Sequence, residues 1–472
     1  YRLTLRLGCI TVEYEDIRGA VNGAISLFWL LNRSAVPEGT MTDWADSIYR
    51  SVMLDFARGT APVDEVLNSI LLAGLSKLNH IHFHLMDSEG LCFRSAALPK
   101  MKAAFGRRYS KADLRRMVEI CELFQMEIVP EIELPAHANA LSEAYPCVQC
   151  RDAGGMKFDS KWTLCPASTE AWKLYRRLLE EVAEIFPCSV IHVGGDELEF
   201  ANRPELSQLC NWDSCEACRK LRIDKKIADK RGEYYYVVNR IHEIISSMGK
   251  RMMMWNDQID ISVDPPIPHD IVIQYWRIAI PENGPVEGCS LEQFVRYGFQ
   301  VINSDYLQTY LDSDRYLSPE KLKNWIPEAA ANALSKSGGK IIGGECCAWE
   351  YGNTEAYPFY RYTFPVSLVL FADRLWNHGS ADYGADYRRA VSECIFGCGL
   401  KEDPFLAIGD IIPPREKGKN CFLPVESIDV EQLNRCKRDM AMQTSKRFWA
   451  DNRSAWLELL GNIESEINSS KG

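Results

Sequence analysis

The chain has 472 residues, which exceeds one ordinary domain and suits a large barrel with an accessory piece. Hydrophobic residues make up 46% of the chain, so a large core can form and general disorder is excluded. The formal net charge of −11 argues against a nucleic-acid-binding surface, and no apolar run is long enough to cross a bilayer.

Residues 1–45 predict the tail of a small α/β domain. Arg2–Leu7 and Ile10–Tyr14 have the pattern of short strands, and an apolar helix is expected from about Ile17 to Leu31. A complete domain does not fit in this length. We therefore expect a truncated N-terminal α/β piece ahead of the main domain.

From Tyr49 onwards, short apolar runs alternate with longer helical segments. This alternation is typical of parallel β/α units, and eight such units close a (β/α)₈, or TIM, barrel. A doubly wound open sheet is the alternative that the pattern leaves. We therefore expect an α/β barrel over residues 46–385. Its expected strands are Ser51–Asp55, His80–Met86, Glu127–Glu133, Ser189–Gly194, Arg251–Asn256, Asp270–Trp276, Phe299–Ser304 and Lys340–Cys346.

One expected barrel helix has well-marked ends. Ser168 is a good N-cap, and Pro187 stops the helix just before the fourth strand. Charged residues, including Glu181, are expected on its solvent face. Its apolar face is formed by Leu174, Leu178, Val182 and Ile185.

The alternation of short apolar runs and helical segments ends at about residue 380. Pro413-Pro414 marks a loop, and the pattern is helical again from Val430 to Ile467. Residues 386–472 are therefore expected to form a C-terminal helical extension packed on the barrel.

The most informative motif follows the fourth expected strand. The apolar run Val190–Val193 ends in Gly194-Gly195, and two adjacent carboxylates, Asp196 and Glu197, come next. Neighbouring strand residues point to opposite faces, so a straight strand cannot aim both carboxylates at one substrate. The glycines let the backbone turn and let a ligand approach closely. The motif therefore predicts glycosidic or other acid–base chemistry at a strand tip.

Other polar and aromatic side chains lie near the expected strand ends. Active sites of such barrels lie at the carboxyl ends of the strands, so these residues are a prediction of the site. A lone tryptophan is more often core packing, but several at strand ends favour a wall for the C–H faces of a sugar. The set comprises Arg50, Asp87, Glu131, Glu133, His137, Trp255, Trp276, Tyr310, Asp312, Trp349 and Glu350.

His80, His82 and His84 alternate along the second expected strand. A strand spreads such side chains along one line, and no third ligand group is obvious. We therefore expect packed or hydrogen-bonded histidines rather than metal ligands, and no metal in the site.

Six motifs in order resemble the β-N-acetylhexosaminidases of glycoside hydrolase family 20, from the N-terminal piece to about Trp376. The Gly-Gly-Asp-Glu segment is moderately specific alone, whereas the ordered combination is strongly specific. The motifs are Tyr49-Arg50 with Met53-Leu54-Asp55; Lys77-Leu78-Asn79 through Asp87; Pro130–His137; His192–Glu197; Tyr310-Leu311-Asp312; and Gly344-Glu345 before Trp349.

The resemblance implies a retaining exo-β-N-acetylhexosaminidase that hydrolyses terminal β-linked GlcNAc or GalNAc without a cofactor. In this substrate-assisted mechanism, the 2-acetamido oxygen of the substrate attacks its own anomeric carbon and forms an oxazolinium ion. Glu197 would be the general acid and then the general base. Asp196 would hold the acetamido N–H and stabilise the positive charge.

The resemblance also implies substrate-binding residues around this pair. Tyr310 would contact the acetamido oxygen, and Asp87 with His137 would orient Glu197. The remaining residues would be Trp255, Trp276 and Trp349 around the acetamido group and the ring, with Arg50, Asp312 and Glu350 at the outer hydroxyls.

The sequence departs from the family's usual pattern in places. Ser88 and Glu89 stand where a second Asp and a Gln are common. One residue is missing after Trp349, which leaves Glu350, the preferred residue, and Tyr351 as candidates for one hydroxyl-binding position. These departures concern the leaving-group side and the preference for the terminal sugar.

Other functions compatible with these residues are a disaccharide-releasing or sulfated-sugar-specific hexosaminidase, an ordinary two-carboxylate glycosidase, and a non-catalytic sugar-binding barrel. A binding module has no need of an acid beside a charge stabiliser, which argues against the last. The expected partner is a glycan or glycoconjugate with a terminal N-acetylhexosamine, and neither nucleic acid nor a membrane span is expected. The sequence carries no signal of oligomeric state.

The chain has 17 cysteines, several within predicted strands or helices, where free thiols are common. With no visible signal peptide, this slightly favours the cytoplasm over a secreted or periplasmic location. Cys147-x-x-Cys150 and Cys215-x-x-Cys218 lie in loops that share one face of the barrel, so their thiolates can meet around a zinc ion. The roughly sixty residues between the pairs exceed zinc-ribbon spacing, so free thiols or disulfides are alternatives.

Overall fold

The structure is a computed structural model, and it describes residues 1–31, 38–104, 107–198, 209–276, 289–311, 317, 322, 325–328, 338–351 and 360–378. The C-terminal extension expected over residues 386–472 lies outside these residues, and so does Asp312. Within the described ranges, no helix is long and apolar enough to cross a membrane.

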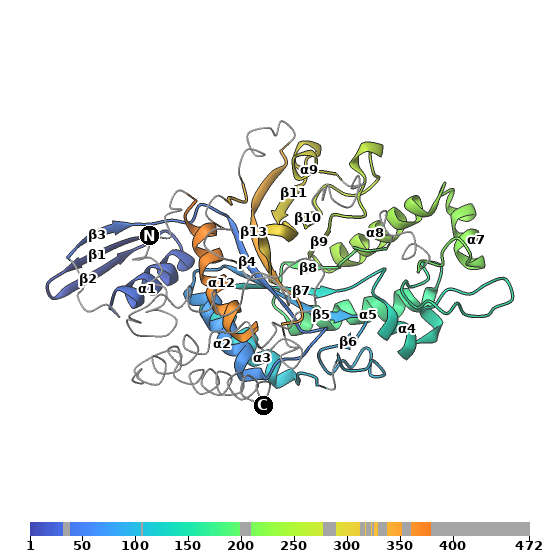
Figure 1. Cartoon of the computed structure of the whole chain (residues 1–472), viewed down its shortest axis with the longest axis horizontal. Helices are drawn as coiled ribbons and strands as arrows, with labels where there is room; N and C mark the ends of the chain where they lie inside the picture. Colours follow the sequence, from blue (N-terminus) through green and yellow to red (C-terminus); the bar gives the residue numbers. More distant parts are fainter. Residues whose placement is uncertain are drawn as a thin grey trace, which may run out of the picture.

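Eight parallel strands form a closed barrel, which confirms the predicted (β/α)₈ fold and excludes the open sheet (Figure 1). The strands follow one another around the barrel in chain order. Closure is direct, because Gln300 pairs with Lys340 and Gly344 pairs with Arg50 across neighbouring strands. The barrel strands are β4 (Tyr49–Asp55), β5 (His80–Asp87), β7 (Glu127–Ile132), β8 (Val190–His192), β9 (Arg251–Trp255), β10 (Val272–Tyr275), β11 (Gln300–Asn303) and β13 (Lys340–Ala348).

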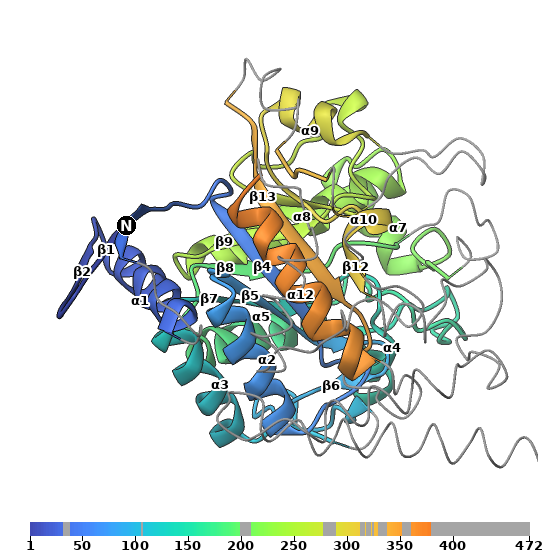
Figure 2. The same cartoon turned by 60° about the vertical axis from the view of Figure 1, so that its left-hand side comes forward.

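Helices pack around the outside of the barrel (Figures 1 and 2). The helix α12 (Tyr360–Trp376) runs along β4 and β13, so it covers the place where the first and last strands meet (Figure 2). The other elements that join the strands are α2 (Val63–Leu75), β6 (Gly90–Leu91), α3 (Lys111–Leu123), α4 (Asn139–Ala144), η2 (Pro146–Val148), α5 (Thr169–Ile185), α7 (Glu216–Lys225), α8 (Lys230–Ser247), η3 (Ile261–Val263), α9 (Leu291–Tyr297), α10 (Tyr306–Thr309) and β12 (Tyr310–Leu311).

The boundaries of α5 agree with the sequence prediction. Ser168 Oγ accepts a hydrogen bond from the Ala171 N–H at 3.1 Å, and the helix ends two residues before its proline. Glu181 differs from the prediction, because it is buried and accepts a hydrogen bond from the Ala96 N–H at 2.7 Å. A loop from another part of the barrel covers it, which helical spacing alone does not predict.

The N-terminal piece is a three-stranded antiparallel sheet with one helix, and it lies beside the barrel (Figure 1). Asp43 joins this piece to the barrel. One of its carboxylate oxygens lies 3.0 Å from Lys77 Nζ, and the other accepts a hydrogen bond from Trp376 Nε1 at 2.9 Å. The elements of this piece are β1 (Arg2–Arg6), β2 (Cys9–Glu13), α1 (Ile17–Leu31) and β3 (Gly39–Thr42), with the strands in the order β2-β1-β3.

The barrel interior changes character along its axis. Near the amino ends of the strands it is apolar, with Val129 and Val272 packed in one cluster. Fully buried ionisable side chains, such as His82 and Glu131, occupy the middle. Trp255 belongs to an aromatic cluster at the carboxyl ends. The interior therefore passes from apolar through ionisable to aromatic toward the end where such barrels carry their sites.

Candidate active site

The structure brings most of the predicted site residues together at the carboxyl ends of the strands. Asp87 ends β5, His137 lies in the loop after β7, and Asp196 with Glu197 follows β8. The remaining described members are Trp255 at the end of β9, Trp276 after β10, Tyr310 at the start of β12, and Trp349 with Glu350 after β13.

Left-handed backbone turns the chain after β8. Gly194, Gly195 and Glu197 have φ of +66°, +86° and +51°. A Cβ on Gly194 would lie 1.9 Å from the Glu133 carboxylate, so any other residue there would have to displace that buried side chain. The Gly195 carbonyl accepts a hydrogen bond from the Tyr234 hydroxyl at 2.6 Å, which holds the turn. This turn lets two adjacent side chains face the same side, as the sequence predicted.

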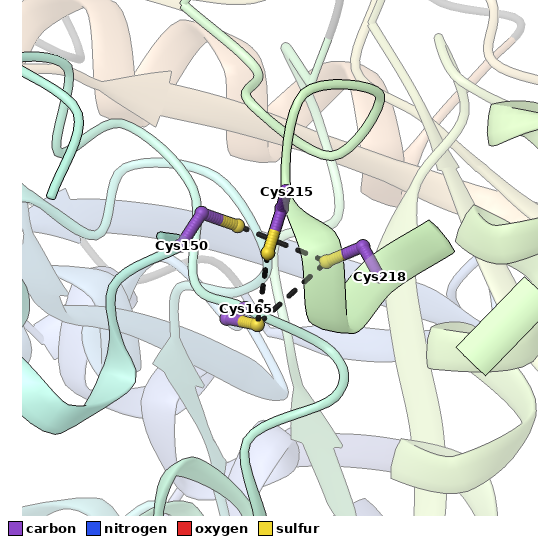
Figure 3. A group of neighbouring side chains, drawn as sticks. All are labelled: Cys150, Cys165, Cys215 and Cys218. Carbon is purple, nitrogen blue, oxygen red and sulfur yellow. Dashed lines mark hydrogen bonds between the residues drawn. The ribbon is translucent and has the colours of Figure 1, made fainter. Parts of the chain in front are cut away.

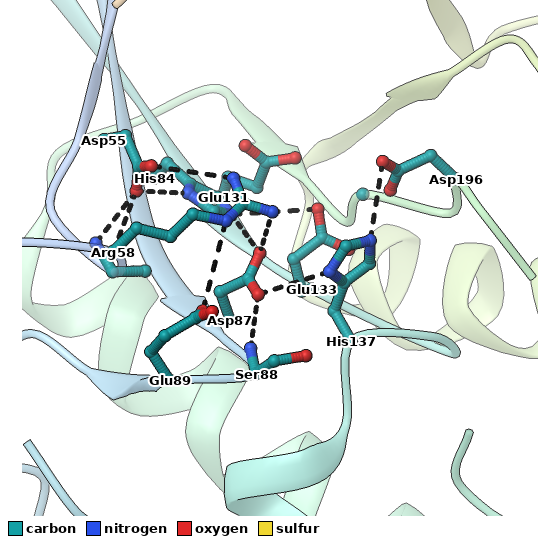
Figure 4. A network of polar contacts seen from close by, with 12 residues as sticks. Asp55, Arg58, His84, Asp87, Ser88, Glu89, Glu131, Glu133, His137 and Asp196 are labelled. Atoms are coloured by element: carbon teal, nitrogen blue, oxygen red, sulfur yellow. Dashed lines mark hydrogen bonds and ion pairs between the residues drawn. The ribbon is translucent and has the colours of Figure 1, made fainter. Parts of the chain in front are cut away.

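His137 connects the acid pair to Asp87, and Figure 4 shows its contacts with Asp87 and Asp196. Its Nδ1 lies 3.2 Å from Asp87 Oδ1, while its Nε2 lies 3.3 Å from Glu197 Oε2 and 3.8 Å from Asp196 Oδ2. The Trp162 ring packs against the imidazole with centroids 4.4 Å apart, and its Nε1 donates to the Glu197 carbonyl at 2.9 Å. Trp162 was not predicted, because it lies deep in a long loop with no local signal.

Arg58 also lies at this end of the barrel and was not predicted. Its Nη2 lies 2.7 Å from Asp87 Oδ2, and its Nη1 lies 3.5 Å from Asp55 Oδ2 (Figure 4). Its Cζ stands 4.8 Å from the centroid of the Trp349 ring, a cation–π contact. Arg58 follows the end of β4 by three residues, so the strand-end rule itself was the signal that points to it.

Arg50, predicted to bind the outer hydroxyls, does not lie at this end of the barrel. It precedes Asp55 by five residues, which is about 16 Å along a strand. Its buried guanidinium donates to the carbonyls of Ser47 at 2.8 Å and Lys77 at 3.0 Å, and stands 5.1 Å from the Trp376 ring centroid. That prediction was wrong, because a residue at the start of a parallel strand lies at the opposite end from the site.

Burial and neighbouring charge set the protonation of the site. Burial raises the pKa of Asp196 to about 8, with His137 opposing the shift and Asp257 adding to it. Burial and the Asp196 carboxylate raise the pKa of Glu133 well above its usual range. Burial alone would lower the pKa of His137, but Asp87 and the other carboxylates hold it well above its usual value. These carboxylates therefore favour the protonated form of the imidazole beside the acid pair.

Asp196 has one oxygen available to a ligand. Its side chain is buried, and its Oδ1 has no hydrogen-bond partner among the residues that the structure describes. A buried acceptor without a donor is unfavourable in the free protein, so a donor from a ligand would be bound strongly there.

The four predicted aromatic residues form one cluster. The rings of Trp276 and Tyr310 stack at 15° with centroids 6.1 Å apart. The Trp349 ring lies 5.8 Å from that of Tyr310 and 5.9 Å from that of Trp255. Aromatic rings from or beyond the carboxyl ends of four different barrel strands thus meet, an arrangement that suits the C–H face of a sugar.

Asp257 joins this aromatic cluster to the acid pair. One carboxylate oxygen accepts a hydrogen bond from Trp276 Nε1 at 3.1 Å, and the other accepts from the Glu197 N–H at 3.0 Å. Asp257 was not among the predicted site residues, although it follows the end of β9 by two residues. Asp257 therefore supplies the connection that keeps the acid beside the sugar-facing wall.

The structure separates the two candidates that follow Trp349. Tyr351 is buried against α2, where its hydroxyl contacts the Ser69 hydroxyl and its ring packs at 6.2 Å from Phe56. Glu350 is half-buried and lies in the turn itself, with φ of +57° and its N–H donating to Asp55 at 2.9 Å. Glu350 is therefore the residue placed near the site.

The histidines of β5 are hydrogen-bonded, as expected. His82 Nδ1 lies 2.8 Å from Glu345 Oε1 and its Nε2 lies 3.0 Å from Glu131, and His84 Nδ1 lies 2.7 Å from Asp55. Three His–carboxylate groups, including His137 with the acid pair, have donor atoms within 4.8 Å of one another, a spacing compatible with a metal ion. In each group one histidine also pairs with a carboxylate outside the group, which is Glu345 for His82, Asp55 for His84 and Asp87 for His137.

Comparison with known proteins gives the same family as the sequence motifs. Residues 48–379 match the model of "Glycosyl hydrolase family 20, catalytic domain". A β-hexosaminidase of Akkermansia muciniphila is 27% identical over 278 residues, 54% of this chain and 55% of that protein. The β-hexosaminidase subunit alpha of Rattus norvegicus is 24% identical over 80% of this chain and 70% of its own length. The chain therefore spans about half of the first relative and more of the second.

Solved structures share the fold. The chitobiase of Flavobacterium johnsoniae has a TM-score of 0.70 at 22% identity, over 100% of this chain and 75% of that one. The exo-β-N-acetylglucosaminidase of Vibrio harveyi has a TM-score of 0.68 at 21% identity, over 89% and 68% of the two chains. Because the family model spans the whole barrel from β4 to α12, the chain belongs to glycosyl hydrolase family 20.

Proposed function

We propose that this chain is a retaining exo-β-N-acetylhexosaminidase that hydrolyses terminal β-linked GlcNAc or GalNAc from glycans or glycoconjugates. The arrangement of the acid pair carries the proposal, since Asp196 and Glu197 approach the same nitrogen of His137. A two-carboxylate glycosidase places its acid and its second carboxylate on either side of the scissile bond. Two carboxylates grouped on one side fit a substrate that supplies its own nucleophile.

The first step forms a cyclic intermediate. The acetamido oxygen attacks the anomeric carbon while Glu197 gives a proton to the departing glycosidic oxygen. Deprotonated Asp196 accepts the acetamido N–H at Oδ1, which lacks a donor among the described residues, and its charge stabilises the oxazolinium ion. The C–O bond to the aglycone breaks as the new C–O bond to the acetamido group forms.

The second step reverses the proton transfer. Glu197, now a carboxylate, takes a proton from water, and the water oxygen attacks the anomeric carbon from the side that the aglycone left. The bond to the acetamido oxygen breaks, so the sugar is released with its original β configuration. His137 is a positioning residue in both steps, because it contacts Glu197 at 3.3 Å and is itself held by Asp87.

The aromatic cluster and Arg58 would bind the sugar. Trp255, Trp276 and Trp349 would pack on the acetamido methyl and the ring, and Tyr310 would donate to the acetamido oxygen. Arg58 replaces Arg50 as the cation near the outer hydroxyls, because it stands over the Trp349 ring. Glu350 is proposed beside it, and Asp312 keeps the role that the sequence resemblance implies.

A thiazoline mimic of the cyclic intermediate tests the mechanism. We expect the protein to hydrolyse an aryl β-GlcNAc substrate and the thiazoline to inhibit that reaction competitively. Hydrolysis that is insensitive to the thiazoline would identify a two-carboxylate glycosidase instead. Sugar binding without any hydrolysis would identify a binding barrel.

A substrate panel tests the specificity. The panel contains GlcNAc, GalNAc, 6-sulfated GlcNAc and disaccharide aryl β-glycosides. An exo-acting enzyme should release only the single terminal sugars, and the ratio of kcat/KM for GlcNAc and GalNAc gives its preference. Release of an intact disaccharide as the main reaction, or a large preference for the sulfated sugar, would replace the proposed activity with one of the related ones.

A further inference from the structure

Four cysteines from two separate loops converge beside the site (Figure 3). Cys150 and Cys165 belong to the loop that follows β7, whereas Cys215 precedes α7 and Cys218 lies in its first turn. All four side chains are buried, with exposed fractions of 3%, 4%, 1% and 0%. Cys147, the other half of the predicted Cys147-x-x-Cys150 pair, is exposed and outside the group, and Cys165 takes its place.

The sulfur atoms have the spacing of a tetrahedral metal site. Sγ of Cys218 lies 3.8 Å from that of Cys150 and 3.6 Å from that of Cys165, which in turn lies 3.9 Å from that of Cys215. All four sulfurs lie within 4.8 Å of one another. Zinc–sulfur bonds of about 2.3 Å in a tetrahedron separate neighbouring sulfurs by about 3.8 Å, whereas a disulfide needs about 2.05 Å.

We infer that Cys150, Cys165, Cys215 and Cys218 bind one structural Zn²⁺ ion. Binding converts four thiols into thiolates and releases their protons, and no change of oxidation state is involved. A complete shell of four protein sulfurs leaves no open position, so this ion would be structural and take no part in hydrolysis. The inference does not depend on the proposed glycosidase reaction.

The protein backbone holds the ligands in place without the metal. The Cys165 N–H donates to the Val148 carbonyl at 2.7 Å, so the segment that carries Cys165 is joined to the segment just before Cys150. Trp212, which is fully buried, donates from Nε1 to the Leu164 carbonyl at 2.8 Å and joins the second loop to the first. The site is thus preorganised, which lowers the entropic cost of binding the ion.

The proposed ion would also stiffen the loop that reaches the acid pair. Trp162 precedes Cys165 by three residues, and it contacts both His137 and the Glu197 carbonyl. Nearby, Ser160 Oγ donates to the Leu209 carbonyl at 2.7 Å, which links the same two loops. The zinc site would therefore fix the two loops that precede and follow the acid pair in the sequence.

Metal analysis of the full chain, purified without a metal-affinity step, tests the inference. We expect about one zinc per chain, removed only by a thiol-modifying mercurial in the presence of a chromogenic chelator. Cys218→Ser and Cys165→Ser should each lose the zinc, whereas Cys147→Ser, the matched control at the exposed position, should retain it. A zinc content near zero in reduced protein, a disulfide among the four residues, or one iron per chain would overturn the inference.

A second measurement covers the case in which these variants do not fold. The wild-type protein is stripped of zinc and reconstituted with Co²⁺, which gives thiolate-to-cobalt charge-transfer bands and the visible bands of a tetrahedral site. The intensity should correspond to about one Co²⁺ and fall to zero when one equivalent of Zn²⁺ is added. Spectra of octahedral, oxygen-bound Co²⁺ would contradict the four-cysteine site. Neither readout depends on hydrolysis, so this inference and the proposed function can fail separately.

Discussion

At the amino end of the barrel Arg50 gives its guanidinium donors to backbone carbonyls and packs on Trp376, whereas at the carboxyl end Arg58 pairs with Asp55 and Asp87. Arg50 is the second residue of β4 and Arg58 follows the end of the same strand, and each guanidinium lies over a tryptophan ring. The first joins parts of the fold, and the second adjusts the charge around a buried carboxylate pair. Because Arg50 lies near the start of a parallel strand and Arg58 lies just after its end, the first has a structural place in the fold and the second is the one proposed to bind the sugar.

The largest expected effect comes from Glu197→Gln at the carboxyl end. The change removes the proposed proton donor, so kcat on a substrate with a poor leaving group should fall about 10²–10⁴-fold. The loss should be smaller for an activated aryl glycoside, which needs less protonation. Glu127→Gln is the matched control at the amino end, where Glu127 accepts a hydrogen bond from the Ser189 N–H at 2.6 Å. Steady-state kinetics give the two values of kcat. Equal losses in both variants would contradict the proposal that the reaction takes place only at the carboxyl end of the barrel.

Asp196→Asn should have the next largest effect. It removes the anion proposed to stabilise the oxazolinium ion, so we expect a loss of kcat of about 10²–10³-fold. Unlike the loss in Glu197→Gln, it should persist with an activated leaving group. Asp43→Asn, which weakens the contact between the N-terminal piece and the barrel, should lower thermal stability and leave kcat unchanged. An Asp196 variant with a wild-type rate would refute the proposed role of that residue.

The arginine pair gives a direct test of the comparison. Arg58→Met should lower kcat/KM about 10–100-fold through lost contacts to the sugar and to Asp87. Arg50→Met should leave kcat/KM nearly unchanged and lower the melting temperature by several degrees, because it leaves buried carbonyls without donors at about 1–3 kcal/mol each. Kinetics and thermal denaturation of both variants give the result. A kinetic defect in Arg50→Met as large as that of Arg58→Met would restore the sequence-based assignment.

The smallest expected effect is on pH-dependent stability. Burial raises the pKa of Asp196 to about 8 in the folded protein, so the folded state binds a proton that the unfolded state releases above its ordinary pKa. The stability contributed by this proton is complete at low pH and is lost as the pH rises through about 8. Asp196→Asn should therefore melt about 1–3 °C higher than wild type at pH 9 and at nearly the same temperature at pH 4.

A matched variant makes that measurement specific. Asp64→Asn changes a carboxylate whose side chain is 86% exposed, so its effect on the melting temperature should be small and similar at both pH values. Differential scanning fluorimetry at pH 4 and pH 9 compares the three proteins. A lower melting temperature for Asp196→Asn at pH 9 would show that the buried charge is not unfavourable in the fold.

The fold was predictable because its signals are local. Each of the eight barrel strands is an apolar run, and their predicted and observed limits differ by no more than a few residues. Ser168 marks the start of α5 through its own hydroxyl. Glu181 was misplaced because its burial depends on a loop whose backbone donors reach it from about 85 residues earlier in the chain.

The site was predictable in part for the same reason. Asp196 and Glu197 follow a strand and two glycines, so a short local motif predicts their position. Trp162 and Cys165 lie within a long loop, and their partners are brought to them only by the closed barrel. Arg58 is a different case, because its strand-end position was visible in the sequence, and the similar residue at the other end of the strand was chosen instead.

Glu197 and two residues placed near the acid pair have a left-handed backbone conformation that non-glycine residues usually avoid. His137, Glu197 and Glu350 have φ of +52°, +51° and +57°, a region in which glycine is more stable by about 1 kcal/mol. Selection for thermal stability alone would therefore favour glycine at each of these positions. Each such substitution would remove a side chain that is proposed to act in the site. Engineering for durability should hold these three positions fixed and look for its gains in the helices outside the barrel.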